Sequence, residues 1–77
     1  MSKLDNDSWN EDVLDCLIKI ETDIFSLNDV YMFEAHLSML HPDNKNVRAK
    51  IRQQLQLLRD YGKIEFVDNR GTYRKLF

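Results

Sequence analysis

Among its 77 residues the chain has one cysteine, one proline and two glycines. The lone thiol of Cys16 cannot form an intrachain disulfide, and no metal ligand stands at a suitable spacing from it. Because Cys16 lies inside an apolar helical pattern, we expect it in or beside the core, with a reactive thiol as the alternative. The scarcity of glycine and proline, together with 43% hydrophobic residues, excludes a disordered chain.

Long apolar segments are also missing. No run approaches the roughly 20 residues that span a bilayer, and the N-terminus lacks the basic and apolar regions of a signal peptide. These absences predict a soluble, cytoplasmic protein without a membrane partner. The length allows one domain, and we expect a flexible N-terminal segment over residues 1–7 followed by a folded domain over residues 8–77.

Residue patterns typical of catalysis or metal binding are absent from the sequence. It has no Cys and His pair with an orienting third group, no glycine-rich phosphate loop and no dense carboxylate cluster. His36 and His41 have no further ligand at a suitable spacing, so we expect both at the surface. The sequence therefore predicts a binding module rather than an enzyme, with no catalytic residue, no metal site and no cofactor.

Charge is distributed unevenly along the chain, although the net charge is only −2. Residues 1–46 hold three lysines against ten acids, a net charge of −7, whereas residues 47–77 hold eight Lys or Arg against three acids, a net charge of +5. Such a division favours one surface directed at a polyanion and another kept away from it.

The first half of the chain predicts two helices separated by a short strand. Ser8-Trp9-Asn10-Glu11 matches a capping box, so the first helix should begin at Ser8. Its apolar face comprises Trp9, Val13, Leu14, Leu17, Ile18 and Ile20. We expect Trp9 to anchor the core, with base stacking as the alternative. Ile24-Phe25 suggests a small strand, and a second capping box at Ser26-Leu27-Asn28-Asp29 starts a helix that runs to about Leu40.

The second half predicts a turn, a third helix and a hairpin. Residues 41–46 contain Pro42, which stops the preceding helix, and Asn44 or Asn46 can cap the next one. That helix, over residues 46–62, buries the stripe Val47, Ile51, Leu55 and Leu58, with Gln54 beside it, and ends at Gly62. Residues 64–67 and 72–76 alternate as strands around the turn 68–71, with Ile64, Phe66 and Tyr73 covering the core.

This order of elements indicates the fold class. It predicts an α+β, mainly α, winged helix-turn-helix with three helices, a short first strand and a two-stranded β-hairpin wing.

The third helix carries an unusual polar face opposite its apolar stripe. This face comprises Ala49, Arg52, Gln53 and Gln56, flanked by Arg48 and Arg59 on one edge and Lys50 on the other. Arginine can bond two acceptors of guanine, and glutamine can bond adenine in the same way, so the set suits a helix in a DNA major groove. A basic helix that faces water or an acidic protein is the alternative.

Four segments of the chain form a familiar pattern: 30–34 (VYMFE), 41–44 (HPDN), 50–66 (KIRQQLQLLRDYGKIEF) and 71–74 (GTYR). Together they resemble the C-terminal winged-helix domain of DpnI-type, methyl-directed restriction endonucleases, a resemblance that extends from Trp9 onward. It implies recognition of N6-methyladenine in duplex 5′-GATC-3′. It also implies an N-terminal nuclease domain in the full-length protein, a type II methyl-directed endonuclease.

Methyl recognition by one helix has a simple geometry. In GATC the two adenines belong to adjacent base pairs on opposite strands, so both methyl groups lie close together in the major groove. We hypothesise that the small Ala49 leaves room for them, with side-chain carbons of Arg52 and Gln53 as walls. The outer G·C pairs are assigned to Arg48 or Arg52. Phosphate contacts are assigned to Asn46, Lys50, Arg70 and Arg74, whereas an internal ion pair is expected for Arg59 and Asp60.

The predicted partner is therefore double-stranded DNA, preferentially adenine-methylated GATC, bound by a monomer. The candidate DNA-binding residues are Asn46, Arg48, Ala49, Lys50, Arg52, Gln53, Gln56, Arg70 and Arg74. Two alternatives remain: a winged-helix transcription regulator that binds unmodified DNA as a dimer, and a winged helix that serves as a protein-docking domain.

Overall fold

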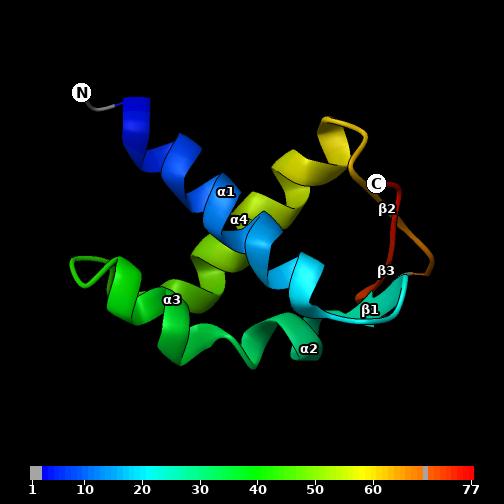
Figure 1. The fold of residues 1–77 in the computed structure, drawn as a ribbon, viewed down its shortest axis with the longest axis horizontal. Coiled ribbons are helices and arrows are strands. Elements are labelled where there is room, and N and C mark those ends of the chain that lie inside the picture. The colour runs from blue at the N-terminus through cyan, green and yellow to red at the C-terminus, as the bar shows by residue number, and fades with distance from the viewer. Residues whose placement is uncertain (1–2, 69) are drawn as a thin grey trace.

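The structure is a computed structural model that describes the backbone of residues 3–68 and 70–77 and the side chains of these residues from Ser8 onward. Within these ranges the chain forms a mainly helical α+β winged helix-turn-helix, as predicted (Figure 1). Its elements are α1 (Lys3–Lys19), β1 (Ile24–Ser26), α2 (Leu27–Tyr31), α3 (Glu34–Leu40), α4 (Val47–Asp60), β2 (Ile64–Phe66) and β3 (Thr72–Lys75).

Helix α1 begins earlier than expected. It starts at Lys3, so Ser8 lies within the helix, and the predicted capping box at Ser8 is wrong. No glycine or proline stands between Lys3 and Ser8 to stop a helix, and a serine with capping potential is also tolerated inside one. Residues 3–7 are helical, and the flexibility predicted for residues 1–7 falls partly on residues 1 and 2, which lie outside the described residues.

The buried face of α1 is narrower than predicted. Trp9, Val13, Cys16 and Leu17 are buried, which confirms Trp9 as a core anchor, whereas Ile18 is 59% exposed. Burial raises the pKa of the Cys16 thiol to about 11. The thiol therefore stays protonated at neutral pH, which agrees with a core residue and not with a reactive thiolate.

The predicted second helix is interrupted. Its capping box is confirmed: Ser26 Oγ accepts from the backbone N–H of Asp29 at 3.2 Å, and Asp29 Oδ2 accepts from that of Ser26 at 2.9 Å. However, Met32 and Phe33 separate α2 from α3, where one helix to Leu40 was expected. On a continuous helix Tyr31 and Phe33 would point about 200° apart, and the break allows both to pack against the core.

Helix α4 has the predicted ends. The side chain of Asn46 accepts a hydrogen bond from the backbone N–H of Ala49, which makes Asn46 the N-cap. Gly62 adopts a φ of 80°, and the backbone N–H groups of Gly62 and Lys63 donate to the carbonyls of Arg59 and Leu58. This pair of bonds is the Schellman arrangement, in which a left-handed residue closes a helix.

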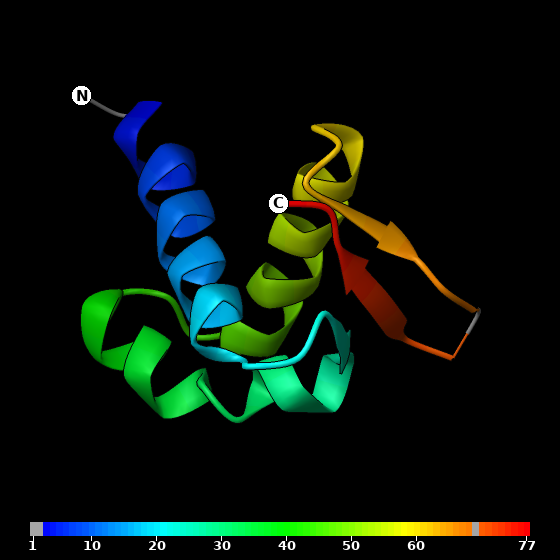
Figure 2. The ribbon, with the colours of Figure 1, turned by 45° about the vertical axis from the view of Figure 1, so that its right-hand side comes forward.

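The wing is part of a three-stranded antiparallel sheet in the order β1-β3-β2 (Figure 2). Tyr73 of β3 pairs with Phe25 of β1 and with Phe66 of β2. Its ring centroid lies 5.3 Å from that of Phe25 and 5.2 Å from that of Phe66. Phe66 was expected to cover the core but is 47% exposed, because it forms the outer end of this aromatic row.

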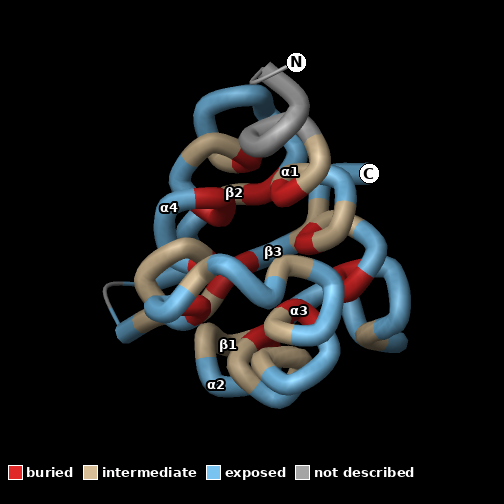
Figure 3. The backbone as a smooth tube through the Cα atoms, turned by 90° about the vertical axis from the view of Figure 1, so that its left-hand side faces the viewer, coloured by how far each residue is buried: buried red, intermediate tan, exposed pale blue. Residues whose placement is uncertain are grey.

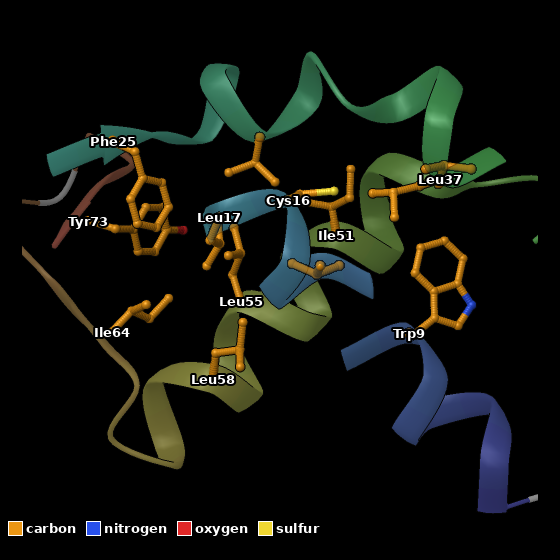
Figure 4. Packing of buried hydrophobic residues seen from close by; sticks show 13 residues of the cluster. Trp9, Cys16, Leu17, Phe25, Leu37, Ile51, Leu55, Leu58, Ile64 and Tyr73 are labelled. Carbon is orange, nitrogen blue, oxygen red and sulfur yellow. The ribbon is translucent and has the colours of Figure 1, made fainter. Parts of the chain in front are cut away.

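One core joins the helices to the sheet. Figure 3 shows buried positions along α1, α4 and the sheet, and Figure 4 shows the side chains extending from Phe25 and Tyr73 at one end to Trp9 at the other. The ring of His41 stacks on Trp9 at 4.0 Å, and its Nε2 lies 2.6 Å from Asp12 Oδ2. The surface position predicted for His41 is therefore wrong, whereas His36 is exposed as expected.

Gln54 is the one buried polar residue of the described chain. Its Oε1 accepts a hydrogen bond from Asn10 Nδ2 at 3.1 Å, which links α4 to α1. Among the described residues its Nε2 has no hydrogen-bond partner. A buried donor without a partner loses its hydration without compensation, at a cost of about 1–3 kcal/mol.

We therefore expect the substitution Gln54→Met to raise the free energy of unfolding by about 1 kcal/mol, because a side chain of similar length replaces the unpaired amide. Asn10 is only half-buried, so water can replace its lost partner. Urea denaturation followed by circular dichroism measures the change. Gln53→Met, at an exposed neighbouring position, is the control and should change stability by less than about 0.5 kcal/mol. A clear loss of stability in Gln54→Met would contradict the prediction.

Candidate nucleic-acid interface

The two faces of α4 are arranged as its sequence pattern predicts. The apolar stripe is buried together with Gln54: Val47, Ile51, Gln54, Leu55 and Leu58. Arg48, Arg52, Gln53 and Gln56 are exposed, and Ala49 and Lys50 are half-buried. The polar face of α4, formed by Ala49, Arg52, Gln53 and Gln56, is therefore accessible along the helix.

A hollow of about 310 Å³ opens beside Ala49. It is lined by Asn44, Asn46, Ala49, Lys50 and Gln53, and we call it the Ala49 hollow. Of the two residues hypothesised as walls of a methyl site, Gln53 lines this hollow and Arg52 does not. A second hollow of about 330 Å³, which also includes Asn44 and Lys50, lies beside it and reaches Trp9 and His41.

Three arginines form a row along one edge of α4. Arg48 lies over the ring of Tyr31, with its guanidinium carbon 4.8 Å from the ring centroid. Arg59 lies over the ring of Phe66 at 4.5 Å. The two ends of the row are thus held by aromatic rings from α2 and the wing, in contacts that combine charge with the ring quadrupole. Neither contact has a signal in the sequence, because each joins α4 to an element distant in the chain.

Arg52 stands between these two held arginines. In the part of the chain that the structure describes, Arg52 and Gln53 form no side-chain hydrogen bond or ion pair, so their donors are available to a ligand. Gln56 Nε2 donates to Asp60 Oδ1 at 3.4 Å. The expected ion pair of Arg59 with Asp60 is present, with 3.7 Å between the charged atoms.

Two of the predicted DNA-binding arginines are engaged in ion pairs. Arg48 Nε donates to Glu34 Oε1 at 2.9 Å, and Arg74 Nη1 donates to Glu65 Oε2 at 2.8 Å. The second pair has a sequence signal, because Glu65 and Arg74 face each other across the hairpin. The pair of Arg48 with Glu34 has no such signal, because it joins two helices, α3 and α4.

The turn of the wing is attached to the start of α2 through Gly71, while Arg70 beside it is exposed. The backbone N–H of Leu27, at the start of α2, donates to the carbonyl of Gly71 at 2.8 Å. Arg70 is exposed, and its backbone N–H donates to Asp68 Oδ1 at 2.8 Å. The neighbouring Asn69, which was predicted in the turn, lies outside the described residues.

A buried helix with an accessible Arg- and Gln-rich face, preceded by a helix and a turn and followed by a hairpin, defines a helix-turn-helix domain that binds double-stranded DNA. Such a domain is a binding module and is not itself catalytic. The chain belongs to the Dam-replacing HTH domain family, DpnI_C, whose family model matches residues 5–75. This match confirms the resemblance to the C-terminal winged-helix domain of DpnI-type enzymes. Among residues 3–68 and 70–77, no helix combines the length and the apolar character needed to cross a lipid bilayer.

Proposed function

We propose that the domain recognises N6-methyladenine in duplex GATC through the major groove, as the specificity module of a methyl-directed restriction endonuclease. The observation that carries this proposal is the Ala49 hollow on α4, next to the unpaired side chain of Gln53 and close in sequence to that of Arg52. Membership of the DpnI_C family supports it. The nuclease domain is proposed for the full-length protein, and the monomeric state for the module.

The Ala49 hollow suits a methyl pair for a physical reason. A small side chain on the exposed side of a groove-binding helix leaves space where a longer one would project toward the bases. Each methyl group that leaves water contributes about 0.8 kcal/mol at most. Two methyl groups therefore increase affinity by no more than about 15-fold, and the remaining affinity must come from hydrogen bonds and phosphate contacts.

The other site residues divide into base and phosphate contacts. We assign a guanine to Arg52, whose donors are unpaired, and adenine-edge contacts to Gln53 and Gln56. With the guanine assigned to Arg52, Arg48, which is held by Glu34 at the start of α4, is left for a phosphate. Phosphates are assigned to Asn46, Lys50, Arg70 and Arg74; the oxygen of Asn46 caps α4, so its amide group is the donor left for a phosphate.

A binding titration tests the proposal with four matched duplexes, which carry unmethylated, hemimethylated or fully methylated GATC or a scrambled methylated sequence. We expect the fully methylated site to bind about 5- to 15-fold more tightly than the unmethylated one, as the burial of two methyl groups allows. Equal binding of all four duplexes would overturn the proposal.

Salt dependence separates DNA binding from protein docking. Four assigned phosphate contacts are cationic, and two of them, Arg48 and Arg74, are held by carboxylates, so log affinity should fall with log salt with a slope between about −2 and −4. A slope near zero would instead favour an apolar docking surface as the function of the domain.

A further inference from the structure

Each of the two elements assigned to DNA carries an arginine that is held by a carboxylate. Glu34, at the start of α3, holds Arg48 at the start of α4, and Glu65 on β2 holds Arg74 on β3. All four side chains are exposed, with 42–61% of their surface accessible. Exposed pairs of this kind contribute little to folding stability, so stability alone does not account for two carboxylates at a surface assigned to a polyanion.

The approach of DNA changes the energy of both pairs. Each ion pair uses one of the five N–H donors of its arginine, so a phosphate that binds Arg48 or Arg74 either displaces the carboxylate or shares the guanidinium with it. In both cases the carboxylate lies close to a negatively charged backbone. Part of the attraction between arginine and phosphate is therefore cancelled, either by the loss of the internal pair or by repulsion between the carboxylate and the phosphate. The cost applies to any DNA sequence, because phosphate contacts carry no sequence information.

We propose that Glu34 and Glu65 limit the affinity of the domain for DNA by holding Arg48 and Arg74 in ion pairs that oppose the binding of DNA phosphates. The assignment of these arginines to the DNA surface rests on the proposed function. The two carboxylates set the overall level of affinity, while the polar face of α4 sets the preference among sequences. The overall affinity and the ratio of affinities between DNA sequences are measured separately, so either proposal can fail alone.

The test uses the variants Glu34→Gln, Glu65→Gln and the double variant. Glutamine keeps the length of the side chain and an oxygen that accepts a hydrogen bond, and removes only the charge. Glu11→Gln is the matched control: Glu11 is exposed on α1, makes no ion pair among the described residues, and α1 packs against the buried side of α4. Circular dichroism establishes that each variant is folded.

Each substitution is expected to raise the affinity for methylated and scrambled duplexes alike by about 1.5- to 5-fold, the range set by exposed ion pairs. The double variant should show roughly the product of the two. The slope of log affinity against log salt should become steeper by up to about 0.9 for each freed arginine, because no carboxylate then competes for it. The ratio between methylated and unmethylated sites should stay within about two-fold of that of the unsubstituted protein, since a uniform cost cancels in a ratio.

Two outcomes would overturn this proposal: affinities that change no more than in Glu11→Gln, or affinities that fall, which would mean that the carboxylates position the arginines for binding. A rise in affinity at all sites, in a protein that shows no preference for methylated DNA, would support the role of Glu34 and Glu65 and overturn the proposed methyl recognition. A preference for methylated DNA, with no rise in affinity in the glutamine variants, would support the proposed methyl recognition and overturn the role of Glu34 and Glu65.

Discussion

Replacing Arg52 with alanine is expected to weaken binding of the fully methylated GATC duplex by about 5- to 150-fold. This range corresponds to the roughly 1–3 kcal/mol that a bidentate contact to a base contributes. Arg52 is exposed and makes no internal hydrogen bond or ion pair in the described part of the chain, so the loss should be confined to binding. The duplex titration gives the change, and Lys19→Ala, which removes an exposed cation at the end of α1, is the control for net charge.

A conservative substitution distinguishes base contact from phosphate contact at the same position. Arg52→Lys keeps the positive charge but loses the planar pair of donors that matches guanine. We expect it to reduce the preference for GATC over the scrambled duplex nearly as much as Arg52→Ala does, and to retain more of the overall affinity. An Arg52→Ala protein with full affinity and full sequence preference would rule out the role assigned to Arg52.

Leu55→Ala should have the largest effect on stability. Leu55 lies in the middle of α4 and is 1% exposed, and removing a buried leucine side chain costs about 2–5 kcal/mol. A domain of 77 residues has about 4–12 kcal/mol in total, so the substitution removes a large fraction of its stability. Urea denaturation measures the loss.

Leu57→Ala provides the matched control for Leu55→Ala. Leu57 is on the same helix but only half-buried, and the same deletion there leaves a site that water can reach. The loss of unfolding free energy in Leu57→Ala should therefore be clearly smaller than in Leu55→Ala. Equal losses at the two positions would contradict the orientation of α4 on which the proposed interface depends.

The sequence predicted those parts of the fold that are determined by local patterns. Val47, Ile51, Leu55 and Leu58 recur at helical spacing, and all four are buried in α4. Asn46 and Gly62 have side-chain and backbone properties that suit helix ends, and both occupy those positions. In each case, residues within one helix determine the outcome.

The remaining features depend on contacts between distant segments. The break at Met32 and Phe33 follows from the packing of two aromatic rings on a core that the local pattern does not reveal. His41 is held by Trp9 and Asp12 on α1. The polar face of α4 was recognisable from periodicity, but the ion pair of Arg48 with Glu34 joins two helices whose relative position only the tertiary structure shows.

Because β3 lies between β1 and β2, the sheet can form only late in the synthesis of the domain. Ribosomes synthesise the chain from its N-terminus, so Phe25 of β1 leaves the exit tunnel long before Tyr73, its partner on β3. The helices can form on the nascent chain, but the sheet closes only when β3 has emerged, and closing so long a loop is slow. Until then, the core residues Phe25 and Ile64 lack their neighbour Tyr73. The domain therefore completes its folding only after β3 has left the ribosome.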